Sequence, residues 1–437
     1  MAHPFVWNTN SPFGCIPVHS QYKILAACAL FIAHVLHAGM AEAADPPRER
    51  GALIGAQTLH RVDRKAIDED NEEVGLSGKA ECDVRVVQLT YASIGVREEP
   101  ATLSAALYVP ENCRGPFPIL AQAHGTQTIR RKLTTDLDVS GSAISFFAAR
   151  GYLVVATDYL GLGKSDYSFH PYLHADSEAS AVIDSIRAAR RAARKLDVPI
   201  SNDVMLFGYS QGGHAVMAAQ REIERQHGAE FNLVASAPMS GPYYLSQTFI
   251  SSWFGQTAGA ENAFASELLS YAVVSYREMY ADVCTNLQDC IAPSYVEVAR
   301  TRFPGEQHLG DIREQNLLPP GKLISQMRNA RFTAGFLLDE HDPFRQALIK
   351  NDLLDWTPVA PMLLCGSHRD AIVDFNNAYA AQAAFRRRGV EVPIVDVADS
   401  VPADAAGSEH HAYSVAPCYA AAREKLFDPK RHSAALK

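Results

Sequence analysis

The most constraining feature of this chain is an apolar strand that ends in a tight turn and runs directly into a helix. The strand pattern covers residues 203–208, and the helix pattern covers residues 211–225. Between them, Gly208-Tyr209-Ser210-Gln211-Gly212 fits the pattern G-x-S-x-G. Such a turn strains the serine backbone, so the flanking residues must be small. The context indicates a nucleophile elbow with Ser210 exposed at its tip, rather than a glycine-rich turn that merely contains serine.

Around this turn, apolar strands alternate with helices. Two alternating segments, residues 83–91 and 101–109, are predicted to pair with each other. The further predicted strands are residues 117–123, 152–157, 233–239, 361–365 and 392–397, and the further predicted helices are residues 143–150, 177–196, 374–388 and 416–427. Strands that are apolar on both faces and alternate with helices form parallel sheets covered on both sides. We therefore predict an α/β fold, with a mostly parallel central sheet flanked by helices.

The regular pattern stops between residues 243 and 355. This stretch is rich in Phe, Tyr and Leu and has helix-like segments at residues 262–274, 293–302 and 342–353, without a convincing strand. Because the sheet pattern resumes directly afterwards, we expect a helical cap, or lid, inserted into one domain. The core would then consist of residues 80–242 and 356–437. A separate domain unrelated to the site is the alternative.

The N-terminus has the features of an export signal. Lys23 precedes the apolar residues 24–33, and Ala41-Glu42-Ala43 offers an A-x-A cleavage site. We predict a signal peptide over residues 1–43 and a secreted or periplasmic protein, with an uncleaved membrane anchor as the alternative. Residues 44–79 are polar and charged for most of their length, and we expect them to form a surface extension.

Cysteine usage agrees with export. Six cysteines follow the predicted cleavage site, and an even number favours disulfides in an oxidising compartment. Proximity in the sequence suggests the pairs Cys284–Cys290, Cys82–Cys113 and Cys365–Cys418. Free buried thiols are the alternative.

Composition excludes one class of partner. The 437 residues carry a formal net charge of -9 and contain no basic run, so we expect no binding of nucleic acid. The hydrophobic fraction of 47% is enough for a large core. The oligomeric state is left open.

A serine becomes a nucleophile only with a base within hydrogen-bond reach and an acid that orients the base. In α/β folds that carry a nucleophile elbow, these residues follow in the order Ser, acid, His. They lie at the carboxyl ends of strands. Asp370 follows the predicted strand 361–365, and His410 and His411 follow the last strand, in a loop predicted over residues 408–412. The spacing to the helix that opens near Pro417 favours His411 as the base, and His410 is the alternative.

The developing negative charge of an acyl-transfer reaction needs two backbone N–H donors. Gln211, directly after the serine, is predicted to supply one. The loop His124-Gly125-Thr126, after an earlier strand, supplies the other, with Thr126 as the expected donor. The glycine-rich residues 158–165 lack the spacing of a phosphate loop and are expected at the mouth of the site. No Cys, His or Glu set at ligand spacing accompanies the two histidines, so we expect no metal.

These motifs resemble those of α/β-hydrolase-fold serine esterases, and more narrowly those of bacterial secretory lipases and fungal lipase-A-like enzymes. The resemblance spans about residues 80–430. It rests on His124-Gly-Thr, Asp158-Tyr-Leu-Gly-Leu-Gly, His170-Pro-Tyr-Leu-His174, Arg187-Ala-Ala-Arg190, Gly208-Tyr-Ser-Gln-Gly-Gly213, Gly366-Ser-His-Arg-Asp370 and His411. It implies the α/β-hydrolase fold with a helical cap, a Ser-Asp-His triad, hydrolysis of carboxylic esters and no cofactor. It also supports His411 as the base.

We therefore expect a secreted serine hydrolase that cleaves carboxylic esters through an acyl-enzyme intermediate. The apolar cap favours a substrate with an apolar acyl or alcohol group, as in lipases and carboxylesterases, and leaves transient contact with a lipid interface open. A serine peptidase of the same fold, or a non-catalytic hydrolase-fold binding protein, is the alternative.

Overall fold

The computed structural model describes residues 48–437, except residues 74–78, 250–252, 255–261 and 435–437. The predicted signal peptide, residues 1–43, lies outside the described residues. No helix among the residues described is long and apolar enough to cross a membrane.

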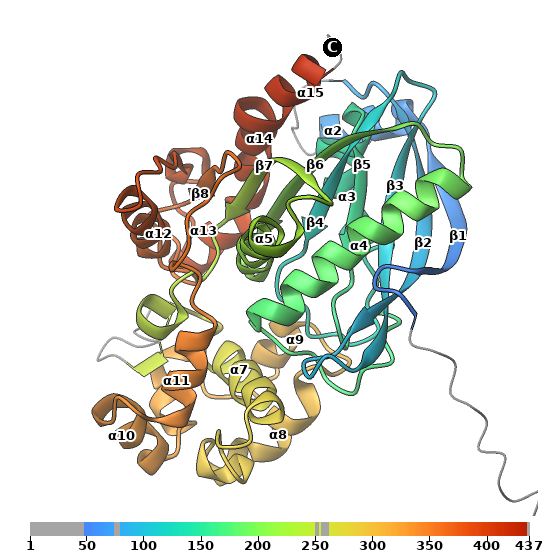
Figure 1. Ribbon diagram of the computed structural model, residues 1–437. Coiled ribbons are helices and arrows are strands. Elements are labelled where there is room, and N and C mark those ends of the chain that lie inside the picture. Colours follow the sequence, from blue (N-terminus) through green and yellow to red (C-terminus); the bar gives the residue numbers. More distant parts are fainter. Residues whose placement is uncertain (1–47, 74–78, 250–252, 255–261, 435–437) are drawn as a thin grey trace, which may run out of the picture. The chain divides into compact units, whose positions relative to one another are not determined.

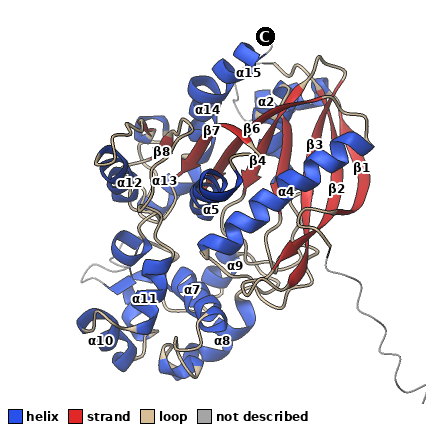
Figure 2. Cartoon of the chain, in the orientation of Figure 1, coloured by secondary structure: helices blue, strands red, loops and turns tan. Residues whose placement is uncertain are grey.

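One nine-stranded sheet organises the described chain, in the order β1-β2-β3-β5-β4-β6-β7-β8-β9 (Figures 1 and 2). The first three strands pair antiparallel, and β3 pairs antiparallel with β5, whereas all pairs from β5 to β9 are parallel. The strands are β1 Leu53–Val62, β2 Asp83–Ile94, β3 Pro100–Glu111, β4 Phe117–Ala123, β5 Leu153–Thr157, β6 Ile200–Tyr209, β7 Asn232–Met239, β8 Leu364–Gly366 and β9 Ile394–Asp396. The predicted α/β class with a mostly parallel sheet is confirmed.

Helices cover both faces of the sheet, which explains why its strands are apolar throughout. They are α3 Leu137–Phe146, α4 Ala175–Lys195, α5 Gln211–Glu222, α12 Asn376–Arg386, α14 Val415–Ala422 and α15 Asp428–Ala434. In β4, Ile119 and Ala121 pack into the core beneath α4 and α5. Leu120, between them, packs into the core on the opposite face, with Phe147 and Tyr419. Alternate residues of a strand point to opposite faces, so both faces must be apolar.

The expectation of a surface extension over residues 44–79 is wrong for its central part. Residues 53–62 form β1, which pairs along its length with β2, and α2 follows at Arg64–Glu73. β1 is an edge strand, and several of its side chains are exposed, including Leu59. An edge strand with polar, half-exposed residues lacks the continuous apolar run that identifies a buried strand.

The loop expected at residues 408–412 is also different in the structure. These residues belong to a short helix, α13, Gly407–Tyr413, which carries both His410 and His411. The backbone N–H of Ala406 and the carboxylate of Glu409 close its first turn. At seven residues the helix is too short for a recognisable apolar period.

Where the structure describes residues 243–355, they form helices joined by turns and irregular segments, with isolated bridges, and they gather beside the sheet at the lower side of Figure 1. The α-helices are α7 Ala265–Met279, α8 Val296–Arg302, α9 Leu309–Glu314, α10 Ala330–Leu338 and α11 Pro343–Lys350. They enclose a core of their own, built around Tyr271, Tyr276 and Phe344. We refer to residues 243–355 as the cap.

All three predicted disulfides are present. Cys82–Cys113 joins the start of β2 to the loop after β3, Cys284–Cys290 closes a short loop in the cap, and Cys365–Cys418 joins β8 to α14. The pairs that are close in the sequence are therefore the pairs that form.

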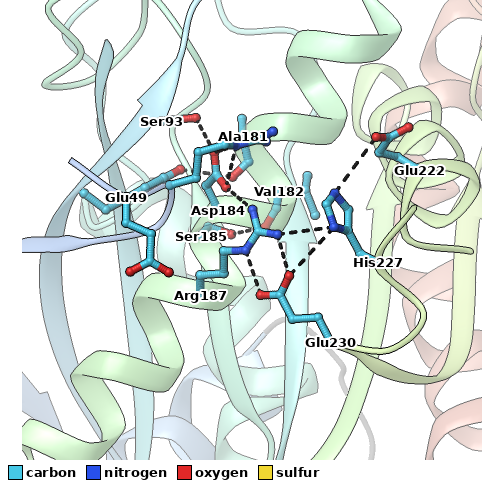
Figure 3. Close-up of polar contacts among 12 residues, drawn as sticks. Glu49, Ser93, Ala181, Val182, Asp184, Ser185, Arg187, Glu222, His227 and Glu230 are labelled. Atoms are coloured by element: carbon cyan, nitrogen blue, oxygen red, sulfur yellow. Dashed lines mark hydrogen bonds and ion pairs between the residues drawn. The ribbon is translucent and has the colours of Figure 1, made fainter. Parts of the chain in front are cut away.

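A buried carboxylate, Asp184, ties α4 to the antiparallel part of the sheet. It accepts hydrogen bonds from Ser93 Oγ at 2.7 Å, from Arg50 Nε at 3.1 Å and from Arg187 at 2.7 Å. Figure 3 shows how Arg187 also reaches Glu230, whose Oε1 lies 2.7 Å from Arg187 Nε. The network therefore joins β2, α4 and the segments that precede β1 and β7.

Replacement of Asp184 by Ala is expected to destabilise the fold by about 3 kcal/mol, because two arginines and a serine lose a shared buried acceptor. Glu230→Ala is the matched control, since Glu230 is partly exposed and its ion pair contributes about 1 kcal/mol or less. Urea unfolding followed by circular dichroism measures both. Equal losses of unfolding free energy in the two variants would contradict the conclusion that Asp184 is the main stabilising residue of this network.

The cap is expected to lose stability as the pH rises, because of Glu267 on α7. Its side chain is buried, and Oε2 has no hydrogen-bond partner among the described residues. Burial raises the pKa of Glu267 to about 7. Between the ordinary pKa of a glutamate side chain and pH 7, the native chain holds a proton that the unfolded chain has lost. The free energy of unfolding therefore falls as the pH rises across this window. Glu267→Gln should raise Tm at pH 8 and leave it nearly unchanged at pH 5, as measured by calorimetry.

Candidate active site

The turn at Ser210 is strained in the way that its sequence predicts. Ser210 has φ of 61° and ψ of -124°, a conformation that non-glycine residues rarely adopt. A Cβ atom on Gly208 would overlap the carbonyl group of Gly212, and one on Gly212 would overlap that of Ala123. The N–H of Ser210 donates to Met239 O at 3.0 Å. Close backbone packing against both neighbouring strands therefore holds the serine at the carboxyl edge of the sheet.

Asp370 and His411 meet at the same edge, although 41 residues separate them. His411 Nδ1 lies 2.6 Å from Asp370 Oδ2. The carboxylate also accepts from Ser240 Oγ at 2.7 Å and from the N–H groups of Ile372 and Val373 at 2.8 and 3.0 Å. Because a carboxylate only accepts, the hydrogen of a neutral His411 is on Nδ1, and Nε2 is left as the basic atom.

His411 and Ser210 line the same cavity. Among the described residues, the two side chains form no hydrogen bond with each other. Such bonds are often long before substrate binds. The neighbouring His410 lies elsewhere: it is fully buried, and its Nδ1 is 3.2 Å from Ser367 Oγ. Burial, with a smaller effect of Arg369, lowers the pKa of His410. Successive residues of α13 thus point in different directions, and only His411 meets Asp370.

The loop after β4 lies directly against the serine. A Cβ atom on Gly125 would be 3.7 Å from Ser210 Cβ and 3.5 Å from Tyr209 O. The backbone N–H groups of Gln211 and Thr126, the two expected donors, make no hydrogen bond to another group in the part of the chain that the structure describes. Both residues line the cavity with Ser210.

A buried polar network behind Gln211 was not predicted from the sequence. Gln211 Nε2 donates to Glu178 Oε1 at 2.8 Å and lies 2.9 Å from His170 Nε2. His214 Nδ1 is 2.6 Å from Glu178 Oε2, and its Nε2 is 3.0 Å from Asn351 O, at the end of the cap. A polar Glu178 on the apolar face of a predicted helix was the only available signal.

His170 is an uncharged member of this network. Its Nδ1 lies 2.8 Å from Leu160 O, and because that carbonyl only accepts, Nδ1 carries the hydrogen. Nε2 is then an acceptor for the Gln211 amide. Burial lowers the pKa of His170 to about 3, so the ring stays neutral at physiological pH. The imidazole therefore orients Gln211 without adding charge to the site.

The glycine-rich residues 158–165 fold around a buried carboxylate. Asp158 accepts from Ser104 Oγ and from the N–H and hydroxyl groups of Thr134. Burial raises the pKa of Asp158. A Cβ atom on Gly163 would collide with Asp158, which accounts for the glycine. Asp158 also lines the cavity, so this stretch lies at the site, as expected.

The cavity has a volume of about 430 Å³. Its polar residues include Ser210, Gln211, Thr126 and His411. The apolar part of the lining comes from both the cap and the core: Phe264, Leu268, Leu309, Ile372, Val373 and Val415. Cavities of this kind bind the apolar part of a ligand and orient it with a few polar groups.

Metal-ligating side chains do not cluster in this part of the molecule. Within the described ranges, no three His, Cys, Asp or Glu side chains are placed to hold a metal ion together. The arrangement can support acyl transfer, because it places a serine, an imidazole, a carboxylate and free N–H donors at one cavity.

Comparison with known proteins agrees with this geometry. The family model of the secretory lipases matches residues 128–311. The structure is similar to that of the rice cell wall degrading esterase LipA from Xanthomonas oryzae, with 41% identity, a TM-score of 0.83, and coverage of 88% of this chain and 100% of that chain.

Candida antarctica lipase A is a more distant neighbour. Its identity is 19%, its TM-score is 0.58, and the match covers 80% of this chain and 77% of that chain, so this similarity concerns the fold alone. Comparison with curated protein sequences found no match. The extent and identity of the match to LipA, together with the family model, show that this chain belongs to the secretory lipase family and is a carboxylic ester hydrolase of the α/β-hydrolase fold.

Proposed function

We propose that Ser210, His411 and Asp370 form the catalytic triad of this esterase. The observation that carries the proposal is the 2.6 Å contact between His411 Nδ1 and Asp370 Oδ2 at the cavity that Ser210 lines. In the first step, His411 Nε2 takes the hydroxyl proton of Ser210 while Oγ forms a bond to the ester carbonyl carbon. Asp370 holds the ring and stabilises the imidazolium that results.

The negative charge that develops on the carbonyl oxygen needs donors that are already in place. We propose that the backbone N–H groups of Gln211 and Thr126 supply two hydrogen bonds to this oxygen. When the tetrahedral adduct collapses, the bond to the alkoxy oxygen breaks, and that oxygen takes the proton from His411 and leaves as the alcohol. The acyl group remains on Ser210. Water, deprotonated by His411, then releases the carboxylic acid and restores the serine.

The substrate class follows from the cavity. Its apolar lining, with Phe264, Leu268 and Leu309 contributed by the cap, favours an ester with an apolar acyl or alcohol part. The volume of about 430 Å³ suits a medium-sized group rather than a long triglyceride. We therefore propose a carboxylesterase or lipase-like enzyme for small and medium esters.

We also propose that the enzyme acts outside the cytoplasm. Three disulfides and membership of the secretory lipase family support this location. We propose that residues 1–43 are removed as a signal peptide by cleavage near Ala43.

Substitution of the triad should abolish turnover of p-nitrophenyl butyrate. Ser210→Ala and His411→Ala are each expected to lower kcat by about 10⁴-fold or more, because the nucleophile and its base act as a unit. A fluorophosphonate probe should label the wild-type protein and not Ser210→Ala. His368→Ala is the control, since His368 is an exposed histidine that pairs with Asp396 outside the cavity.

Two results would contradict the assignment. A folded wild-type protein that the probe does not label would remove Ser210 as a nucleophile. Retained activity in His411→Ala, together with a loss in His410→Gln, would transfer the role of the base to His410. A preference for peptide anilides over p-nitrophenyl esters would favour a peptidase of the same fold.

Filling the cavity from the cap should shorten the preferred acyl chain. Leu268→Trp removes space for about two methylene groups, each worth about 0.8 kcal/mol, so the decanoate-to-butyrate ratio of kcat/KM should fall about 10-fold. Leu338→Trp is the matched control, because Leu338 lies on the cap surface, 85% exposed. An equal change in both variants would show that Leu268 does not limit the acyl chain.

A further inference from the structure

The segment His170-Pro171-Tyr172-Leu173 contacts both residues of the proposed oxyanion site. His170 lies 2.9 Å from the Gln211 amide, and the Tyr172 hydroxyl lies 2.9 Å from Thr126 Oγ1. None of the reaction steps proposed for Ser210 involves this segment. Because each contact reaches a different donor residue, the segment is placed to orient the whole oxyanion site.

Helix α7 of the cap holds this segment from the other side. Tyr271 stacks on Tyr172, with ring centroids 4.4 Å apart and an interplanar angle of 8°. The Tyr271 hydroxyl donates to Gln127 O at 3.0 Å, in the loop that carries Thr126. Ser275 Oγ donates to His170 O at 2.8 Å. The Tyr172 ring is therefore fixed by contacts that do not involve its own hydroxyl group.

Together, the hydroxyl groups of Thr126 and Tyr172 carry one hydrogen atom more than the hydrogen bond between them requires. Thr126 and Tyr172 each bring one O–H, and one of these hydrogens forms the bond between them. Neither oxygen has another hydrogen-bond partner among the described residues. The geometry allows either oxygen to donate. Because a phenol is the stronger donor and an alkyl hydroxyl the better acceptor, we assign Tyr172 as the donor to Thr126. Burial raises the pKa of Tyr172, so the phenol keeps this hydrogen.

The remaining hydrogen belongs to Thr126, in the wall of the cavity. Thr126 and Tyr172 both line it, and the adjacent Gly125 lies against Ser210. We propose that the Thr126 hydroxyl, oriented by the Tyr172 phenol, gives the oxyanion a third hydrogen bond in addition to the two backbone N–H groups. Thr126 is then a catalytic residue through its side chain, and Tyr172 is a positioning residue. This inference rests on the proposed function of Ser210.

Three substitutions separate the hydroxyl group from the backbone N–H. Thr126→Val keeps the N–H and the branched shape and removes the hydroxyl, so kcat should fall about 100-fold with KM nearly unchanged, as for loss of one oxyanion donor. Thr126→Ser keeps the hydroxyl and should retain most of the activity. Tyr172→Phe removes only the orienting bond and keeps the ring on Tyr271, so kcat should fall about 10-fold.

The double variant tests whether the two hydroxyls act through one interaction. Thr126→Val with Tyr172→Phe should be no slower than Thr126→Val alone, because Tyr172 acts only through Thr126. The affinity for an alkyl trifluoromethyl ketone, whose adduct with Ser210 carries an oxyanion, should fall in parallel with kcat/KM. Tyr152→Phe is the matched control, since it removes the hydroxyl group of a buried tyrosine that bonds Asp428, and neither residue lines the cavity.

The results distinguish failure of the third hydrogen bond from failure of the proposed function. Full activity in Ser210→Ala would overturn the nucleophile itself. An inactive Ser210→Ala with a fully active Thr126→Val would overturn only the third hydrogen bond. Multiplicative losses in the double variant, or a loss in Thr126→Ser equal to that in Thr126→Val, would also overturn it, whereas the non-additive pattern supports it.

Discussion

The whole site depends on the close approach of the serine turn to the end of β4. Gly212 lies against the carbonyl group of Ala123, at a distance that no side chain permits. This contact fixes where α5 starts, and it brings the loop at Gly125 against Ser210. The proposed nucleophile and the N–H groups proposed to stabilise its product are thus positioned by one backbone contact. Any larger residue at position 212 would separate them, even if every polar side chain stayed in place.

The sequence predicted those parts of the fold and site that depend on local pattern. The strand 117–123 and the turn at Ser210 have strong local signals, a buried apolar run and a spaced pair of glycines. The edge strand β1 was missed because its exposed residues do not alternate clearly. The helix that carries His411 was expected as a loop because it spans only two turns. In each failure, contacts from distant segments determine a structure that the local residues do not encode.

The polar network around Gln211 was unpredictable for a related reason. Glu178, His214 and His170 come from three separate segments, and their meaning appears only when the chain brings them together. A buried polar group is costly unless it is hydrogen-bonded, so these residues specify one arrangement of α4, α5 and the cap. The end of the cap, at Asn351, accepts from His214 and is therefore part of this arrangement. The same buried polar network therefore joins the cap to the turn that carries Ser210.

The disulfide Cys365–Cys418 encloses a loop with a sequence separation of 53 residues, and both Asp370 and His411 lie within that loop. Closing a loop of this length removes chain entropy from the unfolded state that corresponds to about 4 kcal/mol. The proposed acid and base are thus held together by a disulfide-closed loop as well as by their hydrogen bond. A chain with reduced cysteines lacks this closed loop, so formation of the proposed acid–base pair is coupled to the redox chemistry of the compartment in which the protein folds.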